Sequence, residues 1–473
     1  MGKFTFKASL VTVIIAMVTI SCSGGTTATP SPTATLSVLA SQPATSQPVP
    51  TAAKPTATSQ PVPTAAGPTA TTQPVSTAAA PTGEITFMGG VDTPGFYASM
   101  ASAYEASHPN TKINVIEESW TDIDNKLKTD FAAGGYNEDL VMDATNALPQ
   151  FANAGWVTPL TDAQTAEISP DNISMSIGQF GGKQVAVPYT AYPQLWVANT
   201  ALLAKAGVSV PKTWDDVTAD CQALQKVGVP YCMLLSLKAG GGGYAANGVQ
   251  DFTYAFGGKL LDNAQVVWNT DPLTSQSMQW VADGMTKYHF IDPASITTED
   301  FGVVTAFDQG RYAFEVTSAW GYFQAMGNDT ASTVKNSTQV FLTPTTASGS
   351  GGGTFSYGAV LFIPATAQNP ALAWDFAKFL VSDQGQKQLL TATGNVPVYA
   401  HLYTDPTVTS TMAGMPIIGQ MIAKGTSTLP VTWELQWEDV ITPLIQNAWT
   451  GKMTVQDALD QTTTQCASFS GQP

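Results

Sequence analysis

The side chains in this sequence that could do chemistry are aromatic, carboxylate and amide groups placed just after apolar segments. Such groups combine ring faces with hydrogen-bond donors and acceptors, which suits the non-covalent capture of a small polar molecule. Each aromatic also has an ordinary alternative, because most of the 11 Trp and 14 Tyr residues are expected to pack in the core or on the surface. The candidates that follow predicted strands are Asp92, Glu118, Trp120, Asp143, Asn146, Tyr189, Tyr192, Tyr244, Trp320 and Tyr357.

Catalytic and metal-binding patterns are weak in comparison. His108, His289 and His401 are far apart in the sequence, which argues against a histidine-rich zinc site or a histidine-based protease. Neighbouring acids such as Glu117 and Glu118 would face opposite sides of a strand, whereas a glycosidase needs two carboxylates about 5 to 9 Å apart across one bond. We therefore expect no enzyme activity, no metal and no cofactor.

Charge and glycine content narrow the class of ligand further. All 35 acidic residues lie from Glu84 onward, and Arg311 is the single arginine. These counts exclude a nucleic-acid partner, because phosphate neutralisation needs clustered Lys and Arg. The glycine runs 240–243 and 351–353 lack the Lys-Ser/Thr of a nucleotide-binding loop, so we expect them to let the backbone approach a ligand or let lobes move. The scarcity of Arg and His favours a neutral, hydroxyl-rich ligand.

Alternating strand and helix patterns must position the candidates. Apolar runs predict strands at 85–88, 113–116 and 140–142, and helical spacing predicts helices at 96–108, 123–133 and 148–154. This order predicts an α/β fold with a largely parallel sheet covered by helices. Ligands of such sheets bind beyond the carboxyl ends of the strands, where the candidates lie. Later helices are predicted at 214–226 after Thr213, from Pro272, at 369–381 and after Thr454.

The start of the chain predicts export. Lys3 and Lys7 precede an apolar run from Leu10 to Ile20 that is too short for a good membrane span, so residues 1–21 are predicted to be a signal peptide. The stretch ending in Cys22 resembles the lipobox of bacterial lipoproteins, in which the cysteine is lipidated and becomes the mature N-terminus. Conventional cleavage of a secretory signal is the alternative.

A tether is predicted at 22–82. Of residues 23–82, 46 are Thr, Ala, Pro or Ser and one is charged, so this segment cannot bury a core and is predicted to be a disordered linker. The sequence 46–53 recurs at 59–66 and, altered, at 72–79. Extended polyproline geometry at about 3.1 Å per residue would let 60 residues span up to roughly 190 Å.

Three cysteines remain beyond Cys22. Cys221 lies in a predicted helix and Cys232 in the apolar segment after it, so a disulfide between them is plausible in an exported protein, with Cys466 left free. Their spacing alone does not establish the bond.

Several motifs between 83 and 473 resemble, in order and spacing, the extracellular solute-binding proteins of sugar importers driven by ATP-binding cassettes, of the maltodextrin-binding type. The motifs are Gly181 to Tyr189, Leu195 to Asn199, Pro211 to Asp216, Ala306 to Trp320, Pro370 to Gln386 and Gly451 to Ala458. The resemblance implies two α/β lobes of the type II periplasmic-binding-protein (Venus-flytrap) fold, with crossings near 189–192, near 350–357 and after Gly394. Lobe 1 would comprise 83–190 and 356–395, and lobe 2 would comprise 191–355 and 396–473.

The resemblance also assigns roles to residues. Asp143 and Asn146 fall where the family places side chains that bond sugar hydroxyls. Tyr192 falls at another contact position, where a carboxylate is common. Trp320 corresponds to a stacking tryptophan of the family.

Further positions are matched less closely. Trp437 lies within one position of a second stacking tryptophan, and Trp433 is the alternative. Asp92 follows the first strand, as ligand groups of the family do. Tyr244 lies in a loop that is longer than the family pattern.

The implied ligand is a sugar. A pyranose has an apolar CH face and a rim of hydroxyls, which match aromatic rings beside carboxylates and amides. The implied partners are the membrane permease and, indirectly, its ATPase, and the chain is expected to act as a lipid-anchored monomer on the outer face of the cell membrane. The same fold binding a polyamine or another polar solute is an alternative, and a secreted polysaccharide-active enzyme is a third.

Overall fold

The computed structural model describes residues 80–90, 93–134, 137–240, 244–262, 265–328, 331–427 and 429–470, which belong to one compact unit, Ser76–Pro473. The predicted signal peptide, Cys22, nearly all of the predicted linker and Asp92 lie outside these residues. Within them, no helix is both long and apolar enough to cross a membrane.

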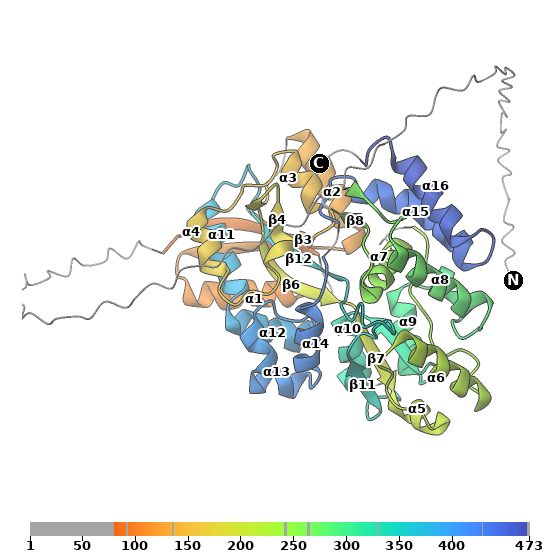
Figure 1. The fold of residues 1–473 in the computed structure, drawn as a ribbon. Helices are drawn as coiled ribbons and strands as arrows, with labels where there is room; N and C mark the ends of the chain where they lie inside the picture. Colours follow the sequence, from red (N-terminus) through yellow and green to blue (C-terminus); the bar gives the residue numbers. More distant parts are fainter. Residues whose placement is uncertain are drawn as a thin grey trace, which may run out of the picture. The chain divides into compact units, whose positions relative to one another are not determined.

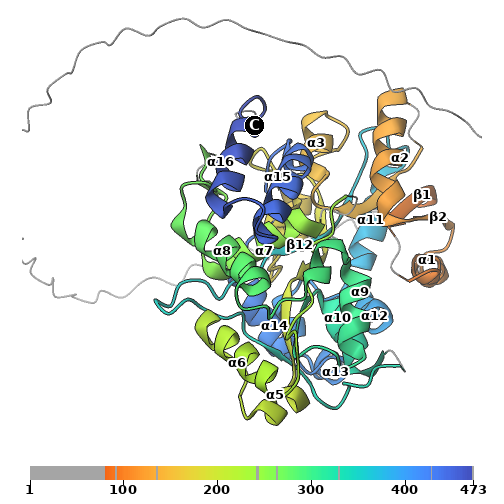
Figure 2. The ribbon, with the colours of Figure 1, turned by 90° about the vertical axis from the view of Figure 1, so that its right-hand side faces the viewer.

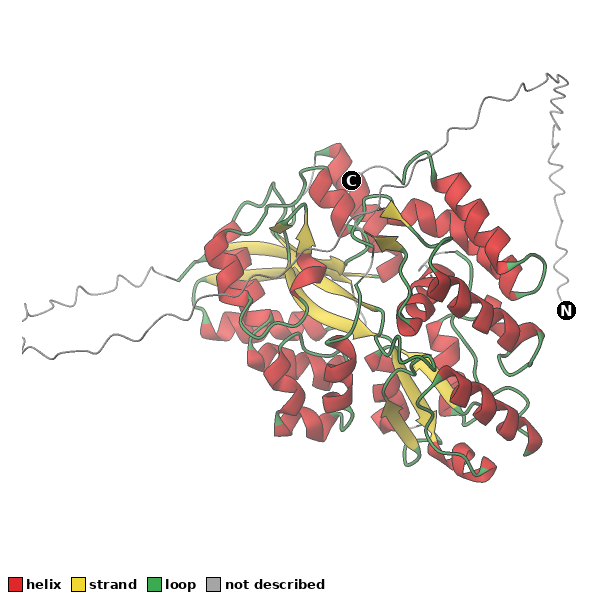
Figure 3. Ribbon diagram, in the orientation of Figure 1, coloured by secondary structure: helices red, strands yellow, loops and turns green. Residues whose placement is uncertain are grey.

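The first lobe is built on a five-stranded sheet with the order β2-β1-β3-β12-β6 (Figures 1 and 3). β1 pairs in parallel with β2 and β3, whereas β12 runs antiparallel to both β3 and β6. Four of the five strands therefore share one direction, as predicted for a largely parallel sheet, but the reversed strand β12 makes two of the four pairings antiparallel. The strands are β1 (Gly83–Gly90), β2 (Thr111–Glu118), β3 (Leu140–Ala144), β6 (Val187–Pro193) and β12 (Ser356–Phe362).

Helices cover both faces of this sheet. On β1, Phe87 points into a core shared with α1 and α11, and its neighbour Met88 points into a second core shared with α2 and α3. Alternation along the strand thus feeds two cores, as expected for a sheet with helices on both faces. The helices of this lobe are α1 (Phe96–Ser107), α2 (Trp120–Ala133), α3 (Leu148–Asn153), α4 (Asp162–Ile168), α11 (Pro370–Leu380) and α12 (Asp383–Thr393).

The second lobe has a three-stranded sheet, β10-β7-β11, in which both pairings are antiparallel (Figures 1 and 3). The sequence did not predict this sheet. Its strands are β7 (Leu195–Asn199), β10 (Phe314–Thr317) and β11 (Thr338–Phe341). Its helices are α5 (Thr200–Ala206), α6 (Trp214–Lys226), α7 (Tyr244–Phe256), α8 (Pro272–Thr286), α9 (Asp300–Asp308), α10 (Ala319–Phe323), α15 (Glu434–Trp449) and α16 (Val455–Cys466) (Figure 2). Two short helices connect to both lobes: α13 (Pro406–Thr411) contacts α12, and α14 (Met415–Ile422) contacts both β6 and β11.

Local signals fix several helix starts. The Thr213 side chain accepts a hydrogen bond from the Asp216 backbone in a capping box at the start of α6, and Thr454 caps α16 through the Asp457 backbone. Minor elements complete the fold: β4 (Gln179–Phe180), β5 (Lys183–Gln184), β8 (Leu261–Asp262), β9 (Gln265–Val266), and the short helical turns η1 (Met175–Gly178), η2 (Pro293–Thr297), η3 (Gln324–Asn328) and η4 (Ala400–Thr404).

Connecting segments between the two sheets lie side by side. The Gln194 backbone, between β6 and β7, donates to the Phe355 carbonyl at 2.9 Å, just before β12. The Thr190 hydroxyl donates to the Val396 carbonyl at 3.0 Å, and the Ser356 backbone donates to the Thr426 carbonyl at 2.9 Å. The chain thus changes sheets near two of the predicted crossings, while the predicted lobe boundaries remain predictions.

Glycine permits a close backbone approach beside these connections. Gly351 adopts a positive φ of 86°, and a Cβ atom there would collide with the Ala255 carbonyl at the end of α7. A Cβ on Gly353 would likewise crowd the Lys424 carbonyl. For run 351–353 the sequence predicts approach to a ligand or movement of lobes; the structure shows instead backbone packed against backbone, which any side chain would push apart.

The Cys221 and Cys232 sulfurs form a disulfide that ties α6 to the following segment, with the Cα atoms 5.4 Å apart. Both cysteines are buried, and Cys466 is free and buried. Closing a loop with a sequence separation of 11 removes conformational freedom mainly from the unfolded chain.

We predict that replacing both residues, Cys221→Ala and Cys232→Ala, lowers the free energy of unfolding by about 3 kcal/mol, because the unfolded chain regains the freedom of that loop. Urea denaturation of the purified protein measures the change. Reductant should destabilise the parent protein and leave the double variant unchanged; an equal effect on both would contradict the prediction.

Candidate functional site

Trp120 lies against the carboxyl end of β1. A Cβ atom on Gly90, the last residue of β1, would come within 2.7 Å of the Trp120 ring, so the indole rests on bare backbone. Trp120 is the first residue of α2, and the Ser119 hydroxyl caps this helix by accepting from the Asp122 backbone at 3.2 Å. The cap fixes the direction in which the half-buried ring leaves the sheet.

Tyr192 and Tyr357 form a pair at the same end of the sheet. They are register partners on β6 and β12, and their ring centroids are 5.2 Å apart. The Asn395 amide lies 3.5 Å from the Tyr192 hydroxyl, to which it donates. Tyr192 is buried and Tyr357 is half-buried, so Tyr357 offers the more accessible ring.

Asp143 and Asn146 lie at the end of β3. Asp143 is only 1% exposed, pairs with Val360 of β12, and its Oδ1 accepts from the Ala144 backbone at 2.8 Å. Asn146 lies in the turn before α3, and its buried Oδ1 has no hydrogen-bond partner among the described residues. The Asn146 Oδ1 is therefore an acceptor that is as enclosed as the Asp143 carboxylate.

A cavity of about 30 Å³ lies in the second lobe, beside the segment that connects the sheets. Among the site residues predicted from the sequence, Tyr244 lines this cavity. The spacing of Tyr244, Asn247 and Asp251 along α7 places the three on one helix face, a polar stripe that could have been found from the sequence. The polar side chains lining the cavity are Gln194, Ser236, Tyr244, Asn247, Asp251 and Asp300.

Burial shifts the titration of the acids in this cavity. It raises the pKa of Asp251 to about 7, opposed by a hydrogen bond from the Phe355 backbone. Burial also raises the pKa of Asp300, opposed by a hydrogen bond from Ser236. For Tyr244, burial is again the main cause of a raised pKa, with the Asp300 and Glu299 charges adding to it. A carboxyl group with a raised pKa keeps its proton to higher pH, and in that form it can donate as well as accept hydrogen bonds, which suits hydroxyl groups.

The cavity is adjacent to the tyrosine pair of the first lobe. Asp251 accepts from the Phe355 backbone, and the Tyr254 ring of α7 lies 6.2 Å from the Phe355 ring. Phe355 in turn stacks on Tyr357 at 5.5 Å between centroids. Tyr192, Tyr244 and Tyr357 are therefore brought to one region, with Phe355 between the two lobes.

Trp320 approaches the same region from α10. It is half-buried, and its ring meets Phe301 of α9 at 4.9 Å with an interplanar angle of 69°. Farther along α10, Phe323 packs against Gly394, whose neighbour Asn395 contacts Tyr192. Figure 1 shows α9 and α10 on the side of the second lobe nearest the connecting segments.

Trp433 and Trp437 have different surroundings. Their exposures are 2% and 0%, and both rings pack against Trp268 in the core of the second lobe, at 6.3 and 6.0 Å. Because enclosed rings have no face left for a solute, their placement does not support the predicted ligand contacts. Asp92 lies outside the described residues.

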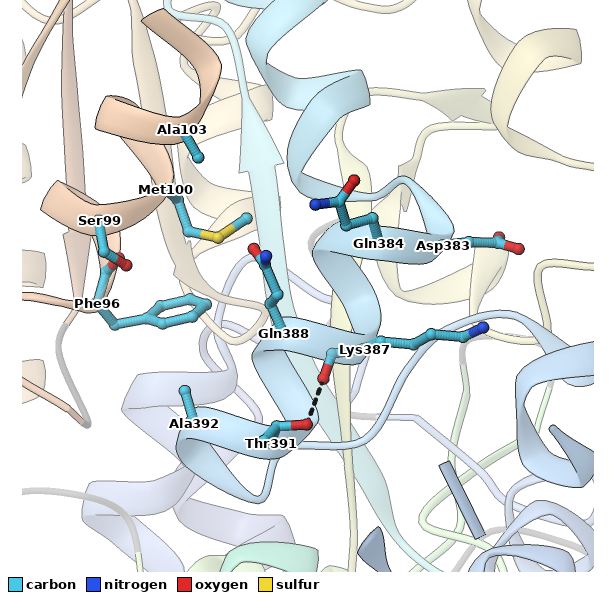
Figure 4. A pocket seen from close by; sticks show the side chains of 10 residues that line it. All are labelled: Phe96, Ser99, Met100, Ala103, Asp383, Gln384, Lys387, Gln388, Thr391 and Ala392. Atoms are coloured by element: carbon cyan, nitrogen blue, oxygen red, sulfur yellow. Dashed lines mark hydrogen bonds between the residues drawn. The ribbon is translucent and has the colours of Figure 1, made fainter. Parts of the chain in front are cut away.

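A larger hollow of about 760 Å³ lies between α1 and α12 of the first lobe (Figure 4). Phe96, Met100 and Ala103 face it from α1, and Gln384 and Gln388 from α12. None of the sequence-predicted site residues lines it. Polar side chains converge instead on the smaller cavity beside the tyrosine pair, which in this conformation has room for about one water molecule. The described residues also contain no cluster of three or more His, Cys, Asp or Glu suited to a metal ion.

Two lobes joined by adjacent connections, with a polar and aromatic site beside them, define a protein that captures a solute between its lobes. Residues 99–416 match the family model described as bacterial extracellular solute-binding protein. The chain belongs to this family.

Solved structures of similar fold include a sugar-bound protein and a sugar-binding protein. The maltose-bound MalE3 of T. maritima is 20% identical with a TM-score of 0.72, and the match covers 81% of this chain and 99% of that one. The cyclic alpha-maltosyl-1,6-maltose binding protein of Arthrobacter globiformis is 19% identical with a TM-score of 0.69, over 82% and 99%. At these identities the likeness establishes the two-lobed fold.

A curated relative matches over a shorter span. The uncharacterized lipoprotein in the oleD 5' region of Streptomyces antibioticus is 29% identical over 114 residues, which are 24% of this chain and 25% of that protein. The match thus spans about a quarter of the relative's length.

We predict that Asp251→Asn makes the protein more stable at pH 8 and leaves its stability at pH 4 nearly unchanged. Unfolded Asp251 ionises near its ordinary pKa of 3.8, whereas the folded protein keeps the proton until about pH 7. Stability is therefore lost as pH rises between these values, and the variant avoids the loss, by up to about 4 kcal/mol. Urea denaturation at both pH values measures it.

Asp439→Asn, at an exposed position on α15, is the matched control and should not show this pH-dependent gain. An equal change in stability at pH 4 and pH 8 for Asp251→Asn would show that the effect is packing rather than ionisation.

Proposed function

We propose that this protein is the carbohydrate-binding subunit of an ATP-binding-cassette importer. Membership of the extracellular solute-binding family supports a binding role. The likeness in fold to maltose-bound and cyclic-maltosyl-maltose-binding proteins supports a sugar or oligosaccharide as the solute.

The observation that carries the proposal is the convergence of ring faces and polar groups at one place. Tyr357 offers a half-buried ring beside the connection. Tyr244, Asn247 and Asp251 supply hydroxyl, amide and carboxyl groups in the adjacent cavity. A pyranose can place its CH face on a ring while its hydroxyls exchange hydrogen bonds with those groups.

Binding would act by shifting a conformational equilibrium. A sugar that contacts both lobes binds the closed arrangement more tightly than the open one, so it increases the closed population. The closed form would then dock on the membrane permease and release the solute. ATP would be hydrolysed on other chains, and this chain would carry no catalytic residue.

The N-terminal segment supplies the anchor in this proposal. Lipidated Cys22 would hold the protein at the outer face of the cell membrane through its acyl chains. The Pro/Thr/Ala-rich segment 23–82 would let the binding unit reach the permease. The short match to a lipoprotein of Streptomyces antibioticus is in keeping with this arrangement.

A cationic solute such as a polyamine is the second candidate. Two carboxyl groups, those of Asp251 and Asp300, line the cavity. The nearby cation Lys238 is engaged with Glu299 at 2.8 Å. An amino group of a solute could take a proton from either acid. This candidate therefore predicts binding of polyamines rather than of sugars.

A thermal-shift panel of mono- and oligosaccharides, polyamines and anions separates the candidates. With residues 23–473, we predict stabilisation by a carbohydrate of about 2.7 kcal/mol at 100 times its dissociation constant, because ligand binds only the folded protein. A shift with a polyamine and none with any carbohydrate would overturn the sugar assignment. Release of shorter products from a glycan would instead indicate an enzyme.

The same assay tests the site through Trp320→Ala. Loss of a half-buried stacking ring should abolish the sugar-induced shift while the ligand-free protein keeps its melting temperature within a few degrees. Trp320→Phe retains a ring face and should keep part of the shift. Unchanged sugar affinity in Trp320→Ala would refute the stacking role.

We predict that Cys22→Ala moves the protein from the membrane to the soluble fraction outside the cytoplasm, since acyl attachment requires the cysteine sulfur. Fractionation and immunoblotting of the native host measure the distribution. Cys466→Ala, which alters a buried free cysteine, should stay with the membrane. Membrane association of Cys22→Ala would contradict lipid anchoring.

A further inference from the structure

Two carboxyl groups line the small cavity of the second lobe without a basic side chain to neutralise them. Asp251 and Asp300 are among the described residues that line it, and these include no Lys, Arg or His. Lys238 follows the lining residue Leu237, but its Nζ pairs with Glu299 at 2.8 Å. Enclosed carboxyl groups are costly unless hydrogen bonds or a positive charge compensate them. The cavity can therefore gain a counter-charge from a solute.

Asp251 is the more enclosed of the two acids. It is 5% exposed, and its carboxyl group accepts one hydrogen bond within the described part of the chain, from the Phe355 backbone. Asp300 is half-buried and accepts from Ser236. An ionised carboxylate has about four acceptor sites. Both acids thus keep most of their acceptor capacity at the wall of the cavity.

The size of the cavity and its lining suit an ammonium group. A volume of about 30 Å³ holds about one water molecule, and an ammonium group occupies a similar space. An ammonium has three N–H donors and no acceptor, so it needs acceptors on several sides. The carboxyl groups supply them from α7 and α9, and Tyr244 and Asn247 line the same space. A hydroxyl group would fit this space but would leave both carboxyl groups without a counter-charge.

The rest of the solute would lie beside the ring of Tyr357. This half-buried ring stacks on Phe355, whose backbone donates to Asp251 at the cavity wall. An aromatic face suits the apolar CH face of a pyranose. One solute matches both the ring and the cavity when a pyranose carries an amino group.

We propose that the solute is an amino sugar, whose protonated amine is held between Asp251 and Asp300 while its pyranose ring packs on Tyr357. This inference rests on the proposed carbohydrate function and adds the charge of the solute to it. The amine would form charge-assisted hydrogen bonds with the two carboxylates, which are stronger than hydrogen bonds between neutral groups.

A bound amine would also strengthen the connection between the lobes. A nearby positive charge favours the ionised form of Asp251. The ionised carboxylate accepts a stronger hydrogen bond from the Phe355 backbone than the neutral carboxyl group does. Phe355 also accepts from the Gln194 backbone at 2.9 Å, between β6 and β7. The charge of the solute is thereby coupled to the segment that joins the two sheets.

Calorimetric titration of the chain from residue 23 to 473 tests the proposal with matched sugars. Glucosamine, galactosamine and the β-1,4-linked disaccharide of glucosamine are each compared with the neutral parent, which is glucose, galactose or cellobiose. At least one amino sugar should bind tenfold or more tightly than its parent, because removing one partner of an enclosed charge pair costs at least that much affinity. N-acetylglucosamine, which lacks the charge, should not show the gain.

Asp300→Asn tests the site, because it removes a charge and keeps the shape of the side chain. The ratio of amino-sugar affinity to parent-sugar affinity should fall by at least tenfold. Asp439→Asn removes the same charge from an exposed position on α15 and should leave the ratio unchanged. This control measures the general attraction of a chain with a net charge of −16 for cations.

The outcomes separate this inference from the proposed function. Amino sugars that bind no more tightly than their parents in all three pairs would overturn the inference and leave carbohydrate binding intact. The same holds if Asp300→Asn weakens both kinds of sugar equally, or if Asp439→Asn lowers the ratio as much as Asp300→Asn does. Binding of spermidine with no binding of any sugar, amino sugars included, would remove the proposed function together with the inference.

Discussion

Phe355 forms contacts to both lobes through its backbone and its ring. Its backbone N–H donates to Asp251 of α7, and its carbonyl accepts from the Gln194 backbone at 2.9 Å. Its ring lies between Tyr254 of the second lobe and Tyr357 of the first. One residue therefore connects the helix that lines the cavity to the strand that carries the tyrosine pair. A change in the position of α7 must alter the start of β12.

This arrangement has an electrostatic cost. A carboxyl group that is 5% exposed must lose most of its hydration, and one backbone hydrogen bond restores only part of it. A leucine or methionine at 251 would pack without that penalty but could not hold the Phe355 amide. The buried acid lowers stability at neutral pH, but it fixes the connection and gives the cavity a polar wall. Such a compromise is common where a protein recognises a solute.

Local features were predictable from the sequence, and non-local ones were not. Thr213 and Thr454 cap helices with bonds three residues away, and the apolar run of β1 lies within eight residues. The antiparallel sheet joins β7 to β10 and β11, more than a hundred residues downstream, and no local pattern encodes that pairing. For the same reason, some residues of the candidate site were predicted from the sequence and others were not. Tyr192 and Tyr357 were candidates from the sequence. The spacing of Asn247 and Asp251 with Tyr244 marks one helix face, but only the packing shows that this face lines a cavity. For Trp437, the resemblance outweighed a local signal: Trp437, Ile441 and Ile445 recur at every fourth residue, and all three are fully buried.

The glycine contacts beside the connection distinguish positions that tolerate no side chain from positions that do. Gly351 and Gly353 bring backbone against backbone, at the end of α7 and near Lys424, and tolerate no side chain. Tyr244 and Asn247 line the cavity and take no part in these glycine contacts. Under the proposed function, substitutions at the cavity would therefore alter which solute is bound, while the backbone packing beside the connection stays the same.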